Sequence, residues 1–167
     1  MSLYLIANGP MPTTAAQSVV TTGTTIKTLL QVKPFNIARI VEWGISFDGF
    51  AAAAPIKCEL MESDVAATVT ASVDADVTKL GPGVGDQAVA SVAGLTLGTS
   101  ATGYTSTAEG ATTAVRMLDV QLIAPTNQYV KQFPLGREPI IQIAKFGRIR
   151  VTAAAAVNAY CYMVLDI

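Results

Sequence analysis

The sequence predicts an all-β protein, an antiparallel β-sandwich with the jelly roll among its expected topologies. Apolar and polar residues alternate with a period of two in most segments that carry large side chains, as half-buried strands do. These segments are rich in β-branched and aromatic residues, and turn residues separate them at short spacing. Alternation alone does not separate a jelly roll from an immunoglobulin-like sandwich.

The first clear strand is predicted in IARIVEWGISFD, residues 37–48. Arg39 is the one residue that breaks its alternation. The apolar positions of this segment define one predicted face: Ile37, Val41, Trp43, Ile45 and Phe47. Trp43, the only tryptophan, is therefore expected in the core rather than at a ligand-stacking site.

Further strands are predicted along the whole chain, at residues 24–32, 56–60, 116–123, 127–133, 139–146, 147–151 and 157–165. In residues 116–123 the alternation places Leu118, Val120 and Leu122 together on one face, less cleanly than elsewhere. Prolines stand at the ends of these segments, where strands tolerate them.

Two alanine tracts, residues 51–54 and 153–156, are read as connections between paired strands. Alanine is the best helix former. However, four residues are too few to nucleate a stable helix in water. A single helix over residues 148–166 would also scatter its apolar side chains around the cylinder, whereas two strands keep them on one face.

The predicted organisation is an extended N-terminal arm over residues 1–23 followed by one sandwich domain over residues 24–167. Long loops rich in alanine, threonine and glycine form an insertion at about residues 63–113, with a short helix near residues 63–70. A chain of 167 residues is long enough for one sizeable core.

Composition argues against several classes of function. The net charge is −1, so nucleic acid is a poor partner, and no apolar run reaches the length of about 18 residues that a membrane helix needs. The start of the chain lacks the basic region of a signal peptide, which favours synthesis in the cytoplasm. We expect no membrane partner and no cofactor.

Catalytic and metal-binding residues are scarce. Histidine is absent, so neither a conventional zinc site nor a histidine-based triad can form. Cys58 and Cys161 lie in apolar segments and are expected to be buried thiols rather than a disulfide. We therefore expect that the protein is not an enzyme.

Charge is uneven along the chain. Residues 42–86 contain eight acidic residues and two lysines, whereas residues 116–150 contain six basic and two acidic residues. Two interpretations stay open: the charges mix on solvated strand faces of one chain, or they form complementary surfaces on neighbouring subunits.

Four residues are candidates for a subunit or capsid interface. Tyr160 and Tyr162 fall on the face opposite Cys161, and tyrosine is favoured at interfaces. Arg148 and Arg150 fall on the outer face of the preceding strand, where they could pair with acids of a neighbour. The alternatives are ordinary sheet-surface tyrosines and arginines that keep the sheet hydrated.

The segment YVKQFPLGREPIIQIAKFGRIRVTAAAAVNAYCYMVLDI, with RIVEWGISFDGFAAAAPIKCELMES and SATGYTSTAEGATT upstream, resembles the small jelly-roll capsid decoration (cement) proteins of tailed bacteriophages. The resemblance spans roughly residues 36–62 and 100–167. It implies a homotrimer that sits at local three-fold points on the capsid exterior, binds the major capsid protein and stabilises the shell.

A structural virion protein is accordingly the first functional hypothesis. The alternative is a receptor- or carbohydrate-binding jelly roll at a phage tail or fibre. Sugar sites usually display clustered aromatic residues, whereas Tyr104 is the lone aromatic in the long Ala/Thr/Gly-rich stretch.

Overall fold

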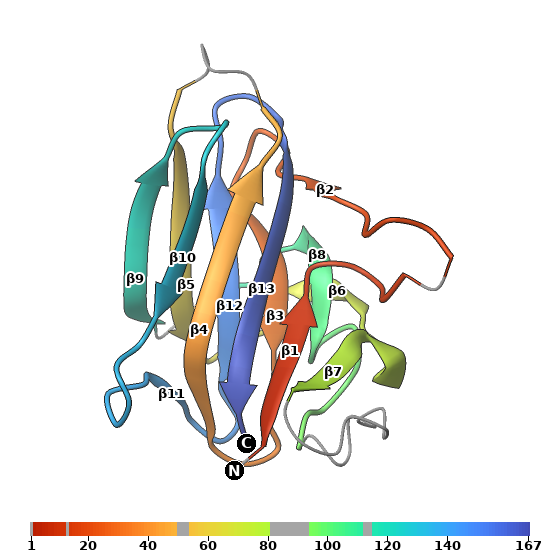
Figure 1. The fold of residues 1–167 in the computed structure, drawn as a ribbon, viewed down its shortest axis with the longest axis vertical. Helices are drawn as coiled ribbons and strands as arrows, with labels where there is room; N and C mark the ends of the chain where they lie inside the picture. The colour runs from red at the N-terminus through yellow and green to blue at the C-terminus, as the bar shows by residue number, and fades with distance from the viewer. Residues whose placement is uncertain (1, 13, 50–53, 81–93, 112–114) are drawn as a thin grey trace.

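The computed structural model describes residues 2–12, 14–49, 54–80, 94–111 and 115–167. These residues form two antiparallel sheets that face each other, which confirms the predicted β-sandwich (Figure 1). The jelly-roll topology stays a prediction. Within the described ranges no helix is long and apolar enough to cross a membrane.

The seven-stranded sheet has the order β10-β4-β13-β1-β7, with β11 paired to β4 and β2 paired to β13. Its strands are β1 (Leu3–Ala7), β2 (Val20–Thr21), β4 (Ala38–Phe47), β7 (Val77–Leu80), β10 (Gln128–Gln132), β11 (Ile140–Ile141) and β13 (Asn158–Asp166).

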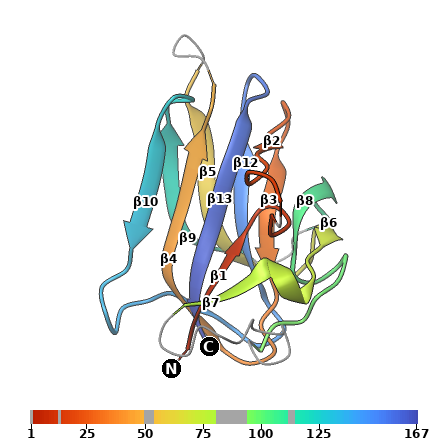
Figure 2. The ribbon, with the colours of Figure 1, turned by 45° about the vertical axis from the view of Figure 1, so that its right-hand side comes forward.

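The six-stranded sheet has the order β6-β8-β3-β12-β5-β9. Its strands are β3 (Lys27–Val32), β5 (Ile56–Ser63), β6 (Thr68–Ala71), β8 (Gly103–Ala108), β9 (Val115–Ile123) and β12 (Phe146–Thr152). Strands β9 and β10 are edge strands of the two sheets and lie on the same side of the sandwich (Figures 1 and 2).

Apolar side chains from both sheets fill the space between them. Trp43 of β4 and Leu60 of β5 are fully buried there, which confirms the core position of the tryptophan. Cys58 and Cys161 are buried free thiols, as predicted. Burial and, second, the nearby Glu59 raise the pKa of Cys58 to about 12.

A bulge in β4 explains the irregular position of Arg39. Glu42 pairs with Val164 and Ile40 with Leu165, so Val41 has no partner in the register. The extra residue changes which face alternate residues occupy. Ile40 is buried before the bulge and Trp43 after it, so the prediction that Ile37 and Val41 share the core face is wrong: Ile37 is exposed and Val41 half-buried.

The second alanine tract connects strands, as predicted, but not paired strands. It leads from β12 in the six-stranded sheet to β13 in the seven-stranded sheet. The first tract likewise lies between β4 and β5, which belong to different sheets, although residues 51–53 are outside the described ranges. The second tract therefore crosses from one sheet to the other.

The N-terminal boundary predicted at residue 23 does not separate an arm from the sandwich. Strand β1 lies inside the seven-stranded sheet, between β13 and β7, and Tyr4 and Ile6 are buried. Only the described residues 10–12 and 14–19 leave the sheets, and most of them are exposed.

The region predicted as a loop insertion contains strands β6, β7 and β8. The helix expected near residues 63–70 is absent from that range, where β5 ends and β6 begins; a short 3-10 helix lies instead at Asp74–Asp76. Residues 81–93 and 112–114 of the predicted insertion fall outside the described ranges. The strand predicted at residues 139–146 is shorter than expected and comprises only β11.

Candidate interaction surface

Arg148 is buried, so its prediction as an outward-facing interface residue is wrong. The guanidinium is in an ion pair with Glu109, and its Nη2 donates a hydrogen bond of 2.6 Å to Thr28 Oγ1. A further contact at 3.5 Å reaches the Val65 carbonyl. The outer face of β12 is thus covered here by segments of the same chain.

Burial lowers the pKa of Arg148, Glu109 opposes this effect, and Arg150 adds to it. The Glu109 carboxylate and the Thr28 hydroxyl therefore stabilise the positive charge of Arg148. Arg148 serves this chain's own packing.

Arg150 is half-buried on the outer face, and its partner is also in the same chain. Its Nε donates to Glu59 Oε2 at 2.9 Å, and Lys57 lies 3.2 Å from the other oxygen of that carboxylate. A second pair joins Arg116 to Glu62 at 3.1 Å. The basic and acidic halves of the sequence therefore meet within one chain at these pairs, which supports the first of the two interpretations of the uneven charge.

Tyr160 and Tyr162 are half-buried on the outer face of the seven-stranded sheet, opposite the core side of Cys161. Their ring centroids are 6.2 Å apart, and the Tyr162 hydroxyl donates to Glu42 Oε1 at 2.6 Å. Burial first, and then this carboxylate, raise the pKa of Tyr162. The ring lies over Gly44, where a Cβ atom would be 2.6 Å from Tyr162 Cε1.

The structure does not bring the four predicted interface residues together. The tyrosines belong to β13 and the arginines to β12, so the two pairs lie on opposite outer faces of the sandwich. An interface role of Tyr160 and Tyr162 stays a prediction.

Strand β9 carries a surface that the sequence pattern missed. Leu60 pairs with Asp119 and Met61 pairs with Met117, so Leu118 has no partner and the strand contains a bulge. The bulge changes the face of every following residue. Asp119 points into the sandwich, whereas Val120 and Leu122, predicted inward, are 44% and 73% exposed.

Asp119 joins the two edge strands on this side. Its carboxylate accepts hydrogen bonds from Trp43 Nε1 at 3.2 Å and from the Tyr129 hydroxyl at 3.0 Å, and Lys131 Nζ lies 3.3 Å away. Gln121 Nε2 donates to it at 2.9 Å. Burial raises the pKa of Asp119, but the bonds from Gln121 and Tyr129 and the charge of Lys131 outweigh burial and lower it.

The outward side chains of β9 are apolar and exposed. We refer to them as the β9 face, and they are Val115, Met117, Val120 and Leu122. β9 pairs only with β5, so one of its edges has no neighbouring strand among the described residues. The strand contains no lysine or proline, but its bulge and the inward-pointing Asp119 protect this edge against strand pairing. The exposed apolar side chains, rather than the edge, are therefore suited to contact with another protein.

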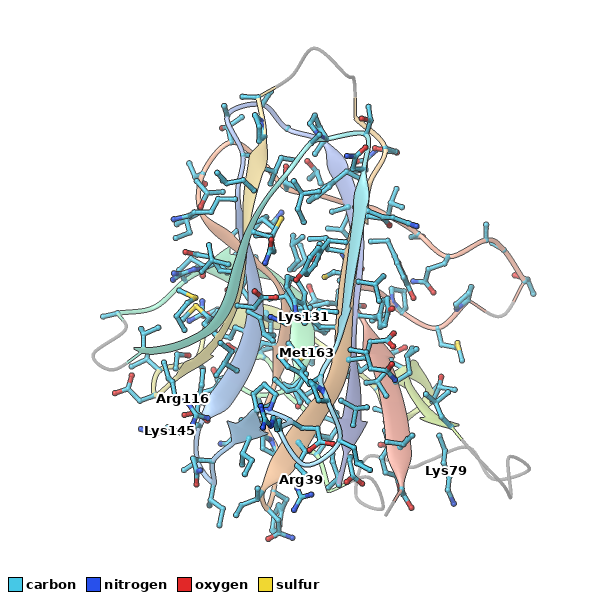
Figure 3. All side chains as sticks on the ribbon, turned by 60° about the vertical axis from the view of Figure 1, so that its left-hand side comes forward. Arg39, Lys79, Arg116, Lys131, Lys145 and Met163 are labelled. Atoms are coloured by element: carbon cyan, nitrogen blue, oxygen red, sulfur yellow. The ribbon has the colours of Figure 1, made fainter. Side chains whose placement is uncertain are left out.

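Three ion pairs around β9 share one arrangement, in which the cation is exposed and the acid is buried. The side chain of Lys57 is 45% exposed against 5% for Glu59, and that of Arg116 is 49% exposed against 9% for Glu62. For Lys131 and Asp119 the values are 37% and 6%. Figure 3 shows Arg116 and Lys131 on the side turned toward the viewer, with Lys145 beside Arg116.

Within the described ranges no group of three or more Asp, Glu, Cys or His residues is arranged to hold a metal ion. Glu42, Glu59, Glu62, Glu109 and Asp119 are each engaged with side chains of their own chain.

Comparison of the chain with protein-family models, with curated proteins and with solved structures finds no match.

Proposed function

We propose that this chain is a structural virion protein: it decorates the exterior of a tailed-bacteriophage capsid as a homotrimer bound to the major capsid protein, and it is not an enzyme. The resemblance of the C-terminal third to capsid decoration proteins motivates the proposal. The observation that carries it is the β9 face, an apolar surface on an edge strand whose four side chains are 42% to 73% exposed.

The polar side chains of the described chain fit a structural role. Arg148 is held by Glu109 and Thr28, and Asp119 by donors from the facing seven-stranded sheet. Catalytic groups act on a substrate, whereas these groups are occupied in joining strands. Protein made in the host cytoplasm would then join the outside of the shell.

Co-sedimentation tests the proposal. The purified protein is mixed with shells assembled from the major capsid protein of the same virus, and light scattering on a sizing column gives its mass in solution. We expect saturable binding to the shells and a mass near three times 17.4 kDa. Failure to bind would overturn the decoration role, and a mass near 17.4 kDa at all concentrations would overturn the preassembled trimer.

A further inference from the structure

The β9 face combines apolar side chains with neighbouring cations. Leu122 pairs across the strands with Lys57, and Val120 pairs with Glu59, which is itself opposite Arg150. Residues directly opposite in antiparallel strands point to the same face of the sheet. The apolar side chains therefore share the outer face with the exposed Lys57 ammonium group, while the neighbouring Glu59 is 4% exposed.

The positive character continues along the edge of the sandwich. Arg116 and Lys145 border one hollow of about 150 Å³ at the Val115 end of the strand, together with Glu62, Ser63 and Asp64. Over residues 115–145 the sequence has four basic residues, and its two acids are the buried Asp119 and the half-buried Glu138.

We propose that the β9 face binds an acidic protein surface with an apolar centre. Apolar side chains at the centre with charges at the rim are the usual anatomy of a protein interface. The exposed member of each of the three ion pairs is the cation, so complementarity favours acids on the partner. Resting on the proposed function, this inference assigns the β9 face to the contact with the major capsid protein.

A second copy of this chain is a poorer occupant of the same face. Two β9 faces brought together would place exposed Lys57 side chains against one another, while the Glu59 carboxylate that balances each of them stays buried. Like charges across an interface oppose association. This repulsion opposes a symmetric β9–β9 pair, whereas the heterologous contacts of a homotrimer join two different surfaces.

Nucleic acid is also a poorer occupant. The β9 face has no aromatic side chain on which a base could stack, and its centre is aliphatic. Binding to DNA rests on many phosphate contacts by cations, whereas the chain as a whole has a net charge of −1.

The experiment compares three variants of the full chain for binding to shells of the major capsid protein. Leu122→Asp places a negative charge at the apolar centre. Lys57→Gln with Lys145→Gln removes two rim charges. Lys79→Gln on β7 is the matched control, because Figure 3 places Lys79 on the other side of the molecule.

We expect Leu122→Asp to weaken binding at least about tenfold, as loss of an interface centre does. The double lysine variant should bind about fivefold more weakly at about 0.05 M salt and like the wild type at about 0.5 M, because salt screens exposed charges. Lys79→Gln should bind like the wild type. Circular dichroism and Trp43 fluorescence check the fold, and Leu122→Asn replaces Leu122→Asp if that variant unfolds.

Any other outcome overturns either the assignment of the β9 face or the decoration role. If the wild type binds shells and the variants bind equally well, the β9 face is not the capsid contact, although the decoration role stands. If the wild type binds no shells, both proposals fail. If Leu122→Asp remains bound to shells but changes the mass of the free protein, the face belongs to a contact between copies.

Discussion

Along β12 the outward-facing Arg148 is fully buried, whereas along β9 the outward-facing Val120 and Leu122 are exposed. Both strands belong to the six-stranded sheet, and both show alternation in the sequence. Glu109 and Thr28 contact the charged residue, whereas Val120 and Leu122 stay 44% and 73% exposed. At both places the exposure is the reverse of what the polarity of the side chain predicts.

The comparison teaches that alternation identifies two faces of a strand but not which face is covered. A charged side chain can be buried when a distant segment supplies its counter-ion. An apolar side chain can be exposed when a bulge turns it outward.

The largest effect is expected when the buried Arg148 loses its counter-ion. Glu109→Gln leaves the Arg148 guanidinium buried without a carboxylate, and the free energy of unfolding should fall by about 3 kcal/mol. Urea denaturation measures it. Combining the change with Arg148→Met removes the unpaired charge, so the double variant should recover much of the lost stability. If Glu109→Gln alone is as stable as the wild type, the ion pair does not stabilise the fold.

A smaller loss is expected where β9 joins β10. Asp119→Asn weakens the bonds from Trp43, Tyr129 and Lys131, and the free energy of unfolding should fall by about 2 kcal/mol. Urea denaturation followed by Trp43 fluorescence measures it.

The pH dependence gives this variant its control. The pKa of Asp119 in the folded protein lies below its ordinary value of 3.8. A depressed carboxyl pKa contributes stability above the ordinary value, and that contribution is lost as pH falls through the folded pKa. Asp119→Asn should lack this part of the acid dependence, and an unchanged acid profile would contradict the role of Asp119.

The outer face of the seven-stranded sheet adds a third case, in which the side chain of a neighbouring strand covers a glycine. Gly44→Ala would place a Cβ atom 2.6 Å from the Tyr162 ring, which the Glu42 carboxylate holds in place. The ring must move, and we expect a loss on the order of 1 kcal/mol. In a Tyr162→Ala background the same change should have no such effect, and equal losses in both backgrounds would rule out this contact.

The smallest effect is expected on the β9 face. Leu122 is 73% exposed, so Leu122→Thr should change the free energy of unfolding by less than about 0.5 kcal/mol. The matched control is Leu60→Ala on the neighbouring strand, where the side chain is fully buried and a loss of about 3 kcal/mol is expected. Similar losses in the two variants would mean that Leu122 packs within the chain.

Alternation was sufficient to predict the sandwich and much of its core. Ile149 and Val151 of β12, and Cys161 and Met163 of β13, lie inward as predicted. Each of these pairs lies in an uninterrupted run of its strand, so the period of two assigns the face directly.

Bulges limited the prediction elsewhere. One extra residue, Val41 in β4 and Leu118 in β9, reverses the faces of the residues beyond it. The sequence contained a signal in both strands, since Arg39 and Arg116 fall on the face of the apolar residues and interrupt the alternation. It did not specify that the interruption in β9 would turn Leu122 outward.

The burial of Arg148 could not be predicted from its own strand. Its counter-ion, Glu109, is 39 residues away and follows β8, a strand that was not predicted. Local pattern carries no information about which distant segment folds over a face. The same reason applies to the cations around β9, whose acidic partners come from β5 in two of the three pairs.

The most direct test of the β9 face is the reactivity of a cysteine at position 122. The two native thiols are buried and burial raises the pKa of each, so they should not react with a thiol reagent in the folded protein. Leu122→Cys should therefore give one fast-reacting thiol in the free protein, slowed at least about tenfold when the protein is bound to shells. A thiol that reacts equally fast in both states would contradict the account.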